Sequence, residues 1–411
     1  MQRIEPCKIF GTITAPTSKS MMQRAIAIAS LAQGKSILHG DTASDDSKAA
    51  LKVIYDLGSE VHKEGNTICI NGAYKPRTNE LNCGESGLGI RMFTPIAALH
   101  SLPLTLHGHG SLKTRPISMI EPPLRDLGVQ IQSNNGLIPI QVCGPLVGGT
   151  THVDGSISSQ VLTGLLIASP CAQQDTYLHT KDLKSKPYID MTIQIMADFG
   201  VSVTHSNYEQ FFVKAHQTYI PQEYTVEGDW SGASFFVVAA ALGGQVTIHN
   251  VRSNSKQADI AIIEAVTRAG AHVQIDDHKI TVNKHTLKAF EFDATECPDL
   301  FPPLVALAAH CTGISKITGV SRLTHKESNR AVVLQTEFAK LGTRIENIDD
   351  TMFIYGGTLQ GGRMHAHNDH RIAMAGACAA IRSQHAVEIE NPECVAKSYP
   401  HFFEDFKNVC G

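Results

Sequence analysis

The residues of this chain that are best suited to chemistry stand at the starts of six apolar segments rich in small side chains. Lys19 and Arg24 open the first of these segments, and Arg371 lies at the start of the last. A helix N-terminus carries unpaired N–H groups and about half a positive charge, so it attracts anions. The pattern therefore predicts an anion site built from several helix ends. The other polar or charged residues in these first turns are Ser20, Arg91, Ser158, Ser159, Gln160, Asp229, Asp299, Asp369 and His370.

Lysine and arginine are unusual at such positions because a cation opposes the helix dipole. Serine and aspartate, by contrast, are the residue types that ordinarily cap a helix, and capping is the simpler explanation for any one of them taken alone. Lys19, Arg24, Arg91 and Arg371 need anionic partners if their helices are buried. We therefore expect the cations, more than the caps, to mark a functional surface.

Gly34-Lys35-Ser36 resembles the end of a phosphate-binding P-loop. That motif requires a glycine at position 29, where this chain has Ala29, and it requires a helix to follow. The segment that follows here has the pattern of a strand, so a nucleotide-binding P-loop is excluded.

The run from His365 to His370 reads H-x-H-x-D-H, which is the zinc string of metallo-β-lactamase-like hydrolases. Only His385 and His401 remain downstream to complete a ligand set, and Arg371 would place a cation beside the metal. We expect no metal in this protein, and a zinc hydrolase stays open as an alternative function.

The elements that must position these side chains repeat along the chain. An apolar-Gly-x-x-apolar pattern closes an amphipathic stretch every 70 or 72 residues. Glycine after the last periodic residue is a helix stop, and the apolar alternation that follows is typical of a strand. The glycines of this pattern are Gly58, Gly128, Gly200, Gly270 and Gly342.

The six apolar segments are predicted to be buried helices because they are apolar on most of their surface. Each is followed by a strand-like segment that ends in a turn, as in SILHG and VTIHN. The repeating unit is therefore helix, strand, helix, strand, about 70 residues long and present six times. An α/β fold follows from this alternation.

Six repeats divide naturally into three and three. We expect residues 18–226 to form one domain, and residues 1–17 with 227–411 to form a second, discontinuous domain. The sixth repeat reaches the end of the chain before its closing strands, and the segment CKIFGTITAP at 7–16 is available to supply them.

The composition excludes several classes of protein. The chain has 411 residues, 35 Lys and Arg against 39 Asp and Glu, and 42% hydrophobic residues, which argues against disorder and against a basic nucleic-acid surface. It contains no apolar run of transmembrane length and no signal-peptide core, so we expect a soluble cytoplasmic protein without membrane partners, and a monomer. Ten scattered cysteines without a C-x-x-C pair are expected to be reduced and mostly buried.

The order of motifs along the whole chain resembles the enolpyruvyl transferases. The resemblance implies a two-domain inside-out α/β barrel of six βαβαββ repeats, three per domain, and a reaction that needs no cofactor and no metal. The segments that carry it are TSKSMMQR at 17–24, RP at 115–116, SSQVLTGLL from 158, SKPYIDMT from 185, PDLFPPL from 298, KESNR from 326, NDHR at 368–371 and AKSYP from 396.

Within that family the chain is more similar to the branch that uses shikimate 3-phosphate than to the branch that uses UDP-N-acetylglucosamine. The second branch generally has Lys-Asn where this chain has Lys19-Ser20, and a reactive Cys or Asp in a loop that contains no Cys here between Leu112 and Leu127. The implied substrates, shikimate 3-phosphate and phosphoenolpyruvate, each carry a carboxylate and a phosphate. Binding them requires several fixed cations.

The resemblance also implies roles for individual residues. Asp299 stands where the family keeps its general base, Lys326 lies near the same hydroxyl, and Glu327, His370 and Lys19 are further catalytic candidates. Phosphoenolpyruvate contacts fall on Lys19, Gly87, Arg115, Gln160, Arg330, Arg371 and Lys397. Shikimate 3-phosphate contacts fall on Lys19, Ser20, Arg24, Ser158, Ser159, Gln160, Ser185, Tyr188, Asp299 and Lys326.

One segment departs from the family pattern. Glu85-Ser86-Gly87-Leu88 replaces the usual Asn-Ala-Gly-Thr, and Met92 stands where proline is common. Glu85 would place a carboxylate near an anionic substrate unless it faces away, so its role is open. A catalytically inactive binding module is the other alternative, although every ionisable position that the mechanism needs is present.

Overall fold

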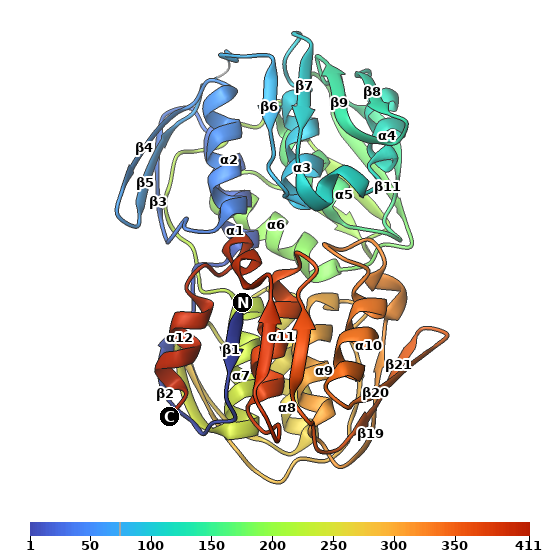
Figure 1. The fold of residues 1–411 in the computed structure, drawn as a ribbon. Coiled ribbons are helices and arrows are strands. Elements are labelled where there is room, and N and C mark those ends of the chain that lie inside the picture. Colours follow the sequence, from blue (N-terminus) through green and yellow to red (C-terminus); the bar gives the residue numbers. More distant parts are fainter. Residues whose placement is uncertain (74) are drawn as a thin grey trace. The chain divides into compact units, whose positions relative to one another are not determined.

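The chain divides into two compact units in a computed structural model that describes residues 1–73 and 75–411 (Figure 1). Unit 1 comprises Met1–Ser18 and Glu227–Gly411, and unit 2 comprises Lys19–Val226. Both ends of the chain therefore belong to unit 1. We propose that these two units are the two domains expected from the repeat pattern.

Unit 2 contains three copies of a β-α-β-α-β-β repeat. The second copy is β6 (Glu80–Asn82), α3 (Gly87–Ala97), β7 (Leu104–His107), α4 (Glu121–Asp126), β8 (Gln130–Asn134) and β9 (Leu137–Cys143). The third copy is β10 (Gly149–Asp154), α5 (Gln160–Ala168), β11 (Thr176–Lys181), α6 (Lys186–Asp198), β12 (Thr204–Ser206) and β13 (Gln210–Val213). The first copy is α1 (Lys19–Leu31), β3 (Lys35–His39), α2 (Asp45–Asp56), β4 (Glu60–Glu64) and β5 (Thr67–Asn71), and it takes its first strand from β14 (Glu223–Thr225).

Unit 1 repeats the same plan. Its first copy is α7 (Trp230–Gly243), β15 (Gly244–His249), α8 (Ile262–Ala269), β16 (His272–Asp276) and β17 (Lys279–Asn283), with β2 (Ile9–Thr14) as first strand. The second is β18 (Glu291–Asp293), α9 (Phe301–Ala309), β19 (Gly313–Thr318), α10 (Arg330–Lys340), β20 (Arg344–Ile348) and β21 (Thr351–Gly356). The third is β22 (Gly362–His365), α11 (His370–Ala380), β23 (Val387–Glu390) and α12 (Phe402–Val409), closed by β1 (Gln2–Ile4).

Five of the six sheets share one strand order. The first strand of each repeat pairs in parallel with the second, and the two closing strands add antiparallel on the other side, as in β6-β7-β9-β8 and β18-β19-β21-β20. The sixth sheet has three strands in the order β1-β23-β22. This common order confirms that the 70-residue period is a repeat of structure.

The expectation that residues 7–16 close the sixth repeat is wrong. Strand β2 within this segment runs parallel to β15, with Ile9 opposite Gly244, and so opens the fourth repeat. The sixth repeat is closed instead by β1, which pairs antiparallel to β23 with Gln2 opposite Ile389. Alternating apolar residues specify a strand but not its partner, and here the partner is more than 200 residues away.

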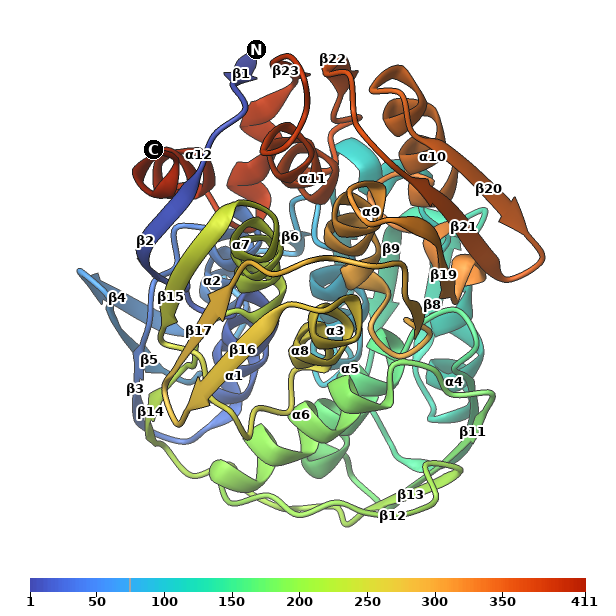
Figure 2. The same cartoon turned by 90° about the horizontal axis from the view of Figure 1, so that it is seen from below.

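The apolar helices lie inside each unit and the sheets lie outside them. In unit 1, helices α7, α9 and α11 pack against one another within the surrounding strands (Figure 2). Their side chains, including Trp230, Phe235 and Phe301, are almost wholly excluded from solvent. In unit 2 the corresponding contacts join α3 to α5 and to α1. All five repeat glycines have positive φ, between 83° and 115°, which explains why glycine ends each outer helix.

The expectation that all cysteines are reduced is wrong for one pair. Cys7 and Cys410 form a disulfide with a Cα–Cα distance of 5.8 Å, and the backbone N–H of Gly411 donates to the carbonyl of Lys8. The other eight described cysteines are free thiols. The pair forms because the start of β2 and the end of α12 lie together in unit 1, which spacing along the chain does not reveal.

Among the described helices, none is long and apolar enough to cross a membrane.

Candidate active site

The inner helices of unit 2 begin at the same end of that unit. Ser86, the N-cap of α3, donates from Oγ to Gln23 Oε1 on α1 at 2.7 Å. Arg91 on α3 donates from Nη1 to the Oε1 atom of Gln160, the first residue of α5, at 2.8 Å. These bonds join the first two turns of three helices, as the anion-site hypothesis requires within one domain.

Arg24 is a buried cation whose hydrogen-bond acceptors, among the residues that the structure describes, are all uncharged. Its guanidinium donates to Thr192 Oγ1 at 2.8 Å, to the carbonyl of Ser20 at 2.8 Å, and more weakly to Thr163 Oγ1 and the carbonyl of Tyr188. Burial lowers its pKa to about 10, because nothing nearby compensates the charge fully. A guanidinium held this way favours an incoming anion.

Lys19, the first residue of α1, forms an ion pair with Asp46. Its Nζ lies 3.1 Å from Asp46 Oδ2, and both side chains are largely buried, at 12% and 7% exposed. Asp46 lies in the first turn of α2, and sequence reasoning missed it. The run Ser44-Asp45-Asp46 at the start of a helix was the available signal, but it has the ordinary pattern of a capped helix start.

Arg115 and Gly87 are in direct contact. A Cβ atom on Gly87 would lie 2.5 Å from Arg115 Nη1, so the guanidinium occupies the space that any other side chain would fill. Arg91 donates from Nη2 to the carbonyl of Pro116 at 2.8 Å, as well as binding Gln160. The structure thus brings together three residues predicted to contact phosphoenolpyruvate, and Arg91, which was not in that set, is the link between them.

The serine positions lie at the starts of α5 and α6. Ser158 Oγ accepts from the backbone N–H of Gln160 at 3.2 Å, and Ser159 is the buried N-cap of α5. Ser185 occupies the N-cap position of α6 with φ of 59°, and Tyr188 follows within the first turn, half-buried. Because α6 packs against both α1 and α5, these residues share one region of unit 2 with Arg24.

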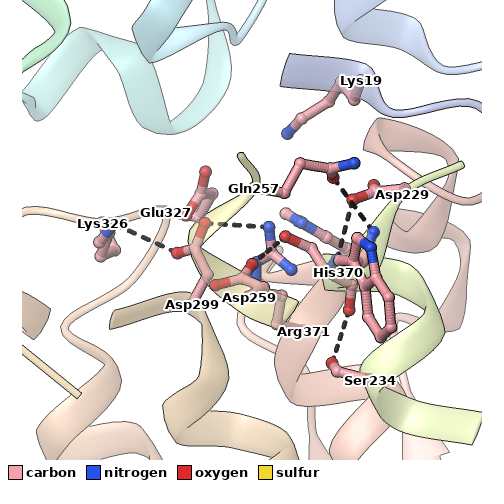
Figure 3. A network of polar contacts seen from close by, with 12 residues as sticks. Lys19, Asp229, Ser234, Gln257, Asp259, Asp299, Lys326, Glu327, His370 and Arg371 are labelled. Atoms are coloured by element: carbon pink, nitrogen blue, oxygen red, sulfur yellow. Dashed lines mark hydrogen bonds and ion pairs between the residues drawn. The ribbon is translucent and has the colours of Figure 1, made fainter. Parts of the chain in front are cut away.

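Asp299 is the centre of the polar cluster in unit 1 (Figure 3). Its Oδ1 accepts from Lys326 Nζ at 3.2 Å and from Arg330 Nη1 at 2.7 Å, and its Oδ2 accepts from Arg371 Nη2 at 3.0 Å. Asp299 therefore does not serve as a simple helix cap. Three cations from two segments, residues 326–330 and the start of α11, converge on one carboxylate, and all four residues were predicted to belong to the site.

The cations around Asp299 decide its charge. Burial by itself would raise the pKa of the carboxyl group, but Arg371, Lys326 and Arg330 together lower it well below the usual range. Burial lowers the pKa of Lys326, and Asp299 opposes that effect. Asp299 is therefore ionised at neutral pH and largely withheld from solvent, with a side chain 20% exposed.

Arg330 is wholly buried and uses its whole guanidinium on carboxylates. Nε and Nη2 donate to Asp369 at 2.7 and 3.2 Å, Nη1 donates to Asp299, and Nη2 also donates to Glu327 at 2.7 Å. Burial would lower its pKa, but Asp369, Glu327 and Asp299 raise it well above its ordinary value. Arg330 thus holds Glu327 and Asp299, two catalytic candidates, in fixed positions.

Asp259 is a buried carboxyl group that sequence reasoning missed. It lies in the short helix Ala258–Ala261, is 1% exposed, and accepts at Oδ2 a hydrogen bond from Ser231 Oγ in the first turn of α7. Burial, and next the charge of Asp299, raise its pKa to about 7. Asp229 does cap α7 as expected, accepting from the backbone N–H of Ser231 at 2.9 Å. No local pattern marks Asp259, since Gln-Ala-Asp resembles any exposed turn.

The zinc string does not converge on one point. His367 Nε2 lies 2.8 Å from Glu337 Oε1, and the backbone N–H of His365 donates to the other oxygen of Glu337. Asp369 is instead held by Arg330, and His370 is fully buried with Nδ1 4.0 Å from Asp369 Oδ1. Among the described residues, no group of three or more possible ligands surrounds a metal-sized space.

Lys397 is the remaining predicted contact, and it lies in unit 1. It ends the short helix Pro392–Lys397, which packs against α11, and it is 7% exposed. Its neighbour Tyr399 donates from its hydroxyl group to Asp405 Oδ2 at 2.6 Å on α12. The C-terminal helix therefore helps to hold the segment that carries Lys397.

Comparisons with known proteins identify the family of this chain. The family model for EPSP synthase (3-phosphoshikimate 1-carboxyvinyltransferase) matches residues 5–406. The chain is 36% identical to the 3-phosphoshikimate 1-carboxyvinyltransferase of Clostridium novyi (strain NT), with 100% of this chain and 97% of the relative covered. It is 34% identical to that of Clostridioides difficile (strain 630), with the same coverage.

Solved structures confirm the two-domain fold. EPSP synthase from Acinetobacter baumannii superimposes with a TM-score of 0.84 at 26% identity, covering 99% of this chain and 98% of that one. The enolpyruvyl transferase NikO from Streptomyces tendae, at 16% identity and a TM-score of 0.79 over 99% of this chain and 96% of that one, shares the fold. The chain belongs to the EPSP synthase (3-phosphoshikimate 1-carboxyvinyltransferase) family.

Proposed function

We propose that this protein transfers the carboxyvinyl group of phosphoenolpyruvate to the 5-hydroxyl of shikimate 3-phosphate and releases phosphate, as a step of the shikimate pathway to aromatic amino acids. The observation that carries the proposal is the ionised Asp299 held by Lys326, Arg330 and Arg371. A carboxylate kept charged beside several cations suits a reaction in which a hydroxyl proton is removed next to anionic substrates. Family membership over nearly the whole chain supports the same activity.

The cations of both units are suited to polyanions. We assign phosphoenolpyruvate to Lys19, Gly87, Arg115, Gln160, Arg330, Arg371 and Lys397, following the family resemblance. We assign shikimate 3-phosphate to Lys19, Ser20, Arg24, Ser158, Ser159, Gln160, Ser185, Tyr188, Asp299 and Lys326. The uncharged acceptors around Arg24 support its assignment to an anion, because a buried guanidinium gains most from a charged partner when its own partners are neutral.

Asp299 is the proposed general base. In the free protein its low pKa makes it a weak base, because three cations share its charge. Phosphoenolpyruvate, which is assigned to Arg371, competes for that cation when it binds, so the pKa of Asp299 rises in that complex. Asp299 is therefore a stronger base in the complex with phosphoenolpyruvate than in the free protein.

The chemical steps then balance as an addition followed by an elimination. Asp299 takes the proton of the 5-hydroxyl, the oxygen bonds to C2 of phosphoenolpyruvate, and an acid donates a proton to C3 to complete the tetrahedral intermediate. Loss of a proton from C3 and cleavage of the bond from C2 to the phosphate oxygen give the product and phosphate. Glu327 and His370 are the candidates for the C3 proton, and buried Arg330 fixes Glu327 for that role. Fixed cations stabilise the developing negative charge.

We further propose that the protein acts in the cytoplasm and as a monomer. Both implied substrates are small charged metabolites, and none of the described helices could span a membrane. Sedimentation at micromolar concentration would test the oligomeric state, and a dimer would overturn that part of the proposal.

The activity is tested by phosphate release from phosphoenolpyruvate in the presence of shikimate 3-phosphate. We expect turnover by the wild type and a loss of at least about 1,000-fold in kcat for Asp299→Ala, with shikimate 3-phosphate still bound in calorimetry. Asp277→Asn, at an exposed hairpin turn, is the matched control and should keep full activity. Phosphate release that does not depend on shikimate 3-phosphate, or activity lost on chelation of zinc, would refute the proposal.

A further inference from the structure

Glu85 lies at the turn between β6 and α3 and binds a second segment of unit 2. Its Oε2 accepts two hydrogen bonds from Ser111, one from the backbone N–H and one from Oγ, both at 3.1 Å. Ser111 belongs to the short helix Gly110–Thr114. The acceptor of both bonds is a carboxylate oxygen, and hydrogen bonds to a charged oxygen are about twice as strong as those between neutral groups.

The bound segment is shaped to receive this carboxylate. Gly110 has φ of +55°, and a Cβ atom there would lie 2.1 Å from Glu85 Oε1. The residues just before these two are also hydrogen-bonded, since the backbone N–H of His109 donates to the carbonyl of Gly84 at 2.9 Å. Glu85 therefore faces the segment that begins at Gly110, which answers how a carboxylate is accommodated at this turn.

Arg115 directly follows that short helix. Its backbone N–H donates to the carbonyl of Leu112, and its guanidinium lies on Gly87, only two residues after Glu85. Arg91, in the next turn of α3, holds the carbonyl of Pro116 at 2.8 Å. Glu85 thus binds the start of the segment 110–116 through its carboxylate. The end of that segment contacts Gly87 and Arg91 of α3.

We propose that Glu85 is a positioning residue that fixes the segment 110–115 so that Arg115 is held over Gly87, oriented to bind an anion. The inference rests on the proposed function in that Arg115 is taken to bind phosphoenolpyruvate. Glu85 itself is assigned no contact with substrate. It acts by keeping the binding orientation of Arg115 populated before the ligand arrives.

The expected signature is a change in affinity without a change in the chemical step. If loss of Glu85 lowers the fraction of molecules with Arg115 correctly placed to about one tenth, the apparent KM for phosphoenolpyruvate rises about 10-fold. At saturating substrate the same complex forms, so kcat stays within about 2-fold of wild type. The KM for shikimate 3-phosphate is expected to change far less.

The experiment compares four variants of the full chain: Glu85→Ala, Glu85→Gln, Ser111→Ala and the double variant Glu85→Ala with Ser111→Ala. We expect Glu85→Gln, which keeps an acceptor oxygen, to recover part of the affinity. Ser111→Ala keeps the backbone donor and should have a smaller effect than Glu85→Ala. The double variant should be no worse than Glu85→Ala alone, because both changes break the same contact. Glu80→Ala, an exposed glutamate on β6, is the matched control.

Hydrogen exchange at residues 110–115 gives a readout that does not depend on activity. Faster exchange of the Ser111 amide in Glu85→Ala, with exchange of α5 unchanged, supports the contact. Unchanged exchange in this segment, or equal rises in KM for both substrates, overturns the proposal. A wild type without turnover would refute the proposed function, and the exchange experiment would still decide whether Glu85 holds this segment.

Discussion

Replacing Asp259 by asparagine should make the stability of unit 1 less dependent on pH. Asp259 is 1% exposed, and Oδ1 has no hydrogen-bond partner among the described residues. Its pKa is about 7 in the folded protein, against 3.8 for an ordinary aspartate, chiefly because burial disfavours the charge and next because Asp299 is nearby. Between these values the folded chain holds a proton that the unfolded chain has lost, so stability falls as pH rises from about 4 to about 7.

The size of this effect follows from the two pKa values. A difference of about 3 corresponds to about 4 kcal/mol, which is an upper bound because Asp259 and Asp299 titrate together. Below about pH 4 Asp259 is protonated in both the folded and the unfolded chain, so its burial costs no stability through ionisation. Above about pH 7 the loss of stability is complete. An asparagine side chain at this position would not ionise and would still accept the hydrogen bond from Ser231. We therefore expect the stability advantage of Asp259→Asn over wild type to grow by at least about 2 kcal/mol between pH 5 and pH 8.

Denaturant unfolding at pH 5, 6, 7 and 8 measures this difference. The fluorescence of Trp230, the only tryptophan in the chain and a buried residue of α7, reports on unit 1 specifically. Asp277→Asn, at an exposed position, is the control and should follow wild type at every pH. A stability difference between Asp259→Asn and wild type that does not change with pH would mean that Arg371 keeps Asp259 ionised throughout, and the reasoning would be wrong.

Three further predictions concern single contacts. Gly87→Ala should push the Arg115 guanidinium aside by about 1 Å and raise the KM for phosphoenolpyruvate by up to about 100-fold in steady-state kinetics, with Tm unchanged. Gly357→Ala is the control, because its added methyl group meets open space, and it should change neither the KM nor the Tm. Arg24→Met should weaken the binding of shikimate 3-phosphate about 100-fold in calorimetry. The free energy of unfolding should stay within about 1 kcal/mol of wild type, because the substitution removes an uncompensated buried charge. A loss of several kcal/mol in the free energy of unfolding would contradict this. Dithiothreitol should lower the Tm of wild type by opening the link between Cys7 and Cys410, and a Cys410→Ser variant should be insensitive to it.

Features that depend on near neighbours in the chain could be predicted from the sequence. The glycines at 58, 128, 200, 270 and 342 end outer helices because a positive φ is needed there, and this need shows in the residue type itself. The inner helices were recognisable because they are apolar on all sides. The cations near their N-termini stood out because they oppose the helix dipole, and Lys19, Arg24 and Arg371 do lie in charged or buried surroundings.

Contacts between distant residues could not be predicted in this way. Asp46 beside Lys19, Asp259 beside Ser231 and the Glu85 contact with Ser111 each join segments whose local patterns resemble ordinary caps and turns. The carboxylates at 299, 327 and 369 become one network only because the fold places a single buried guanidinium, that of Arg330, between them.

The tertiary structure also decided which strands and cysteines pair. A strand has the same alternation whichever sheet it joins, so the sequence alone could not assign β2 to β15 and β1 to β23. Cys7 and Cys410 are separated by 403 positions, and only the folding of both chain ends into unit 1 brings them within bonding distance. Periodicity along the chain determines what each element is, whereas the partner of each element depends on how all of them pack around the buried helices.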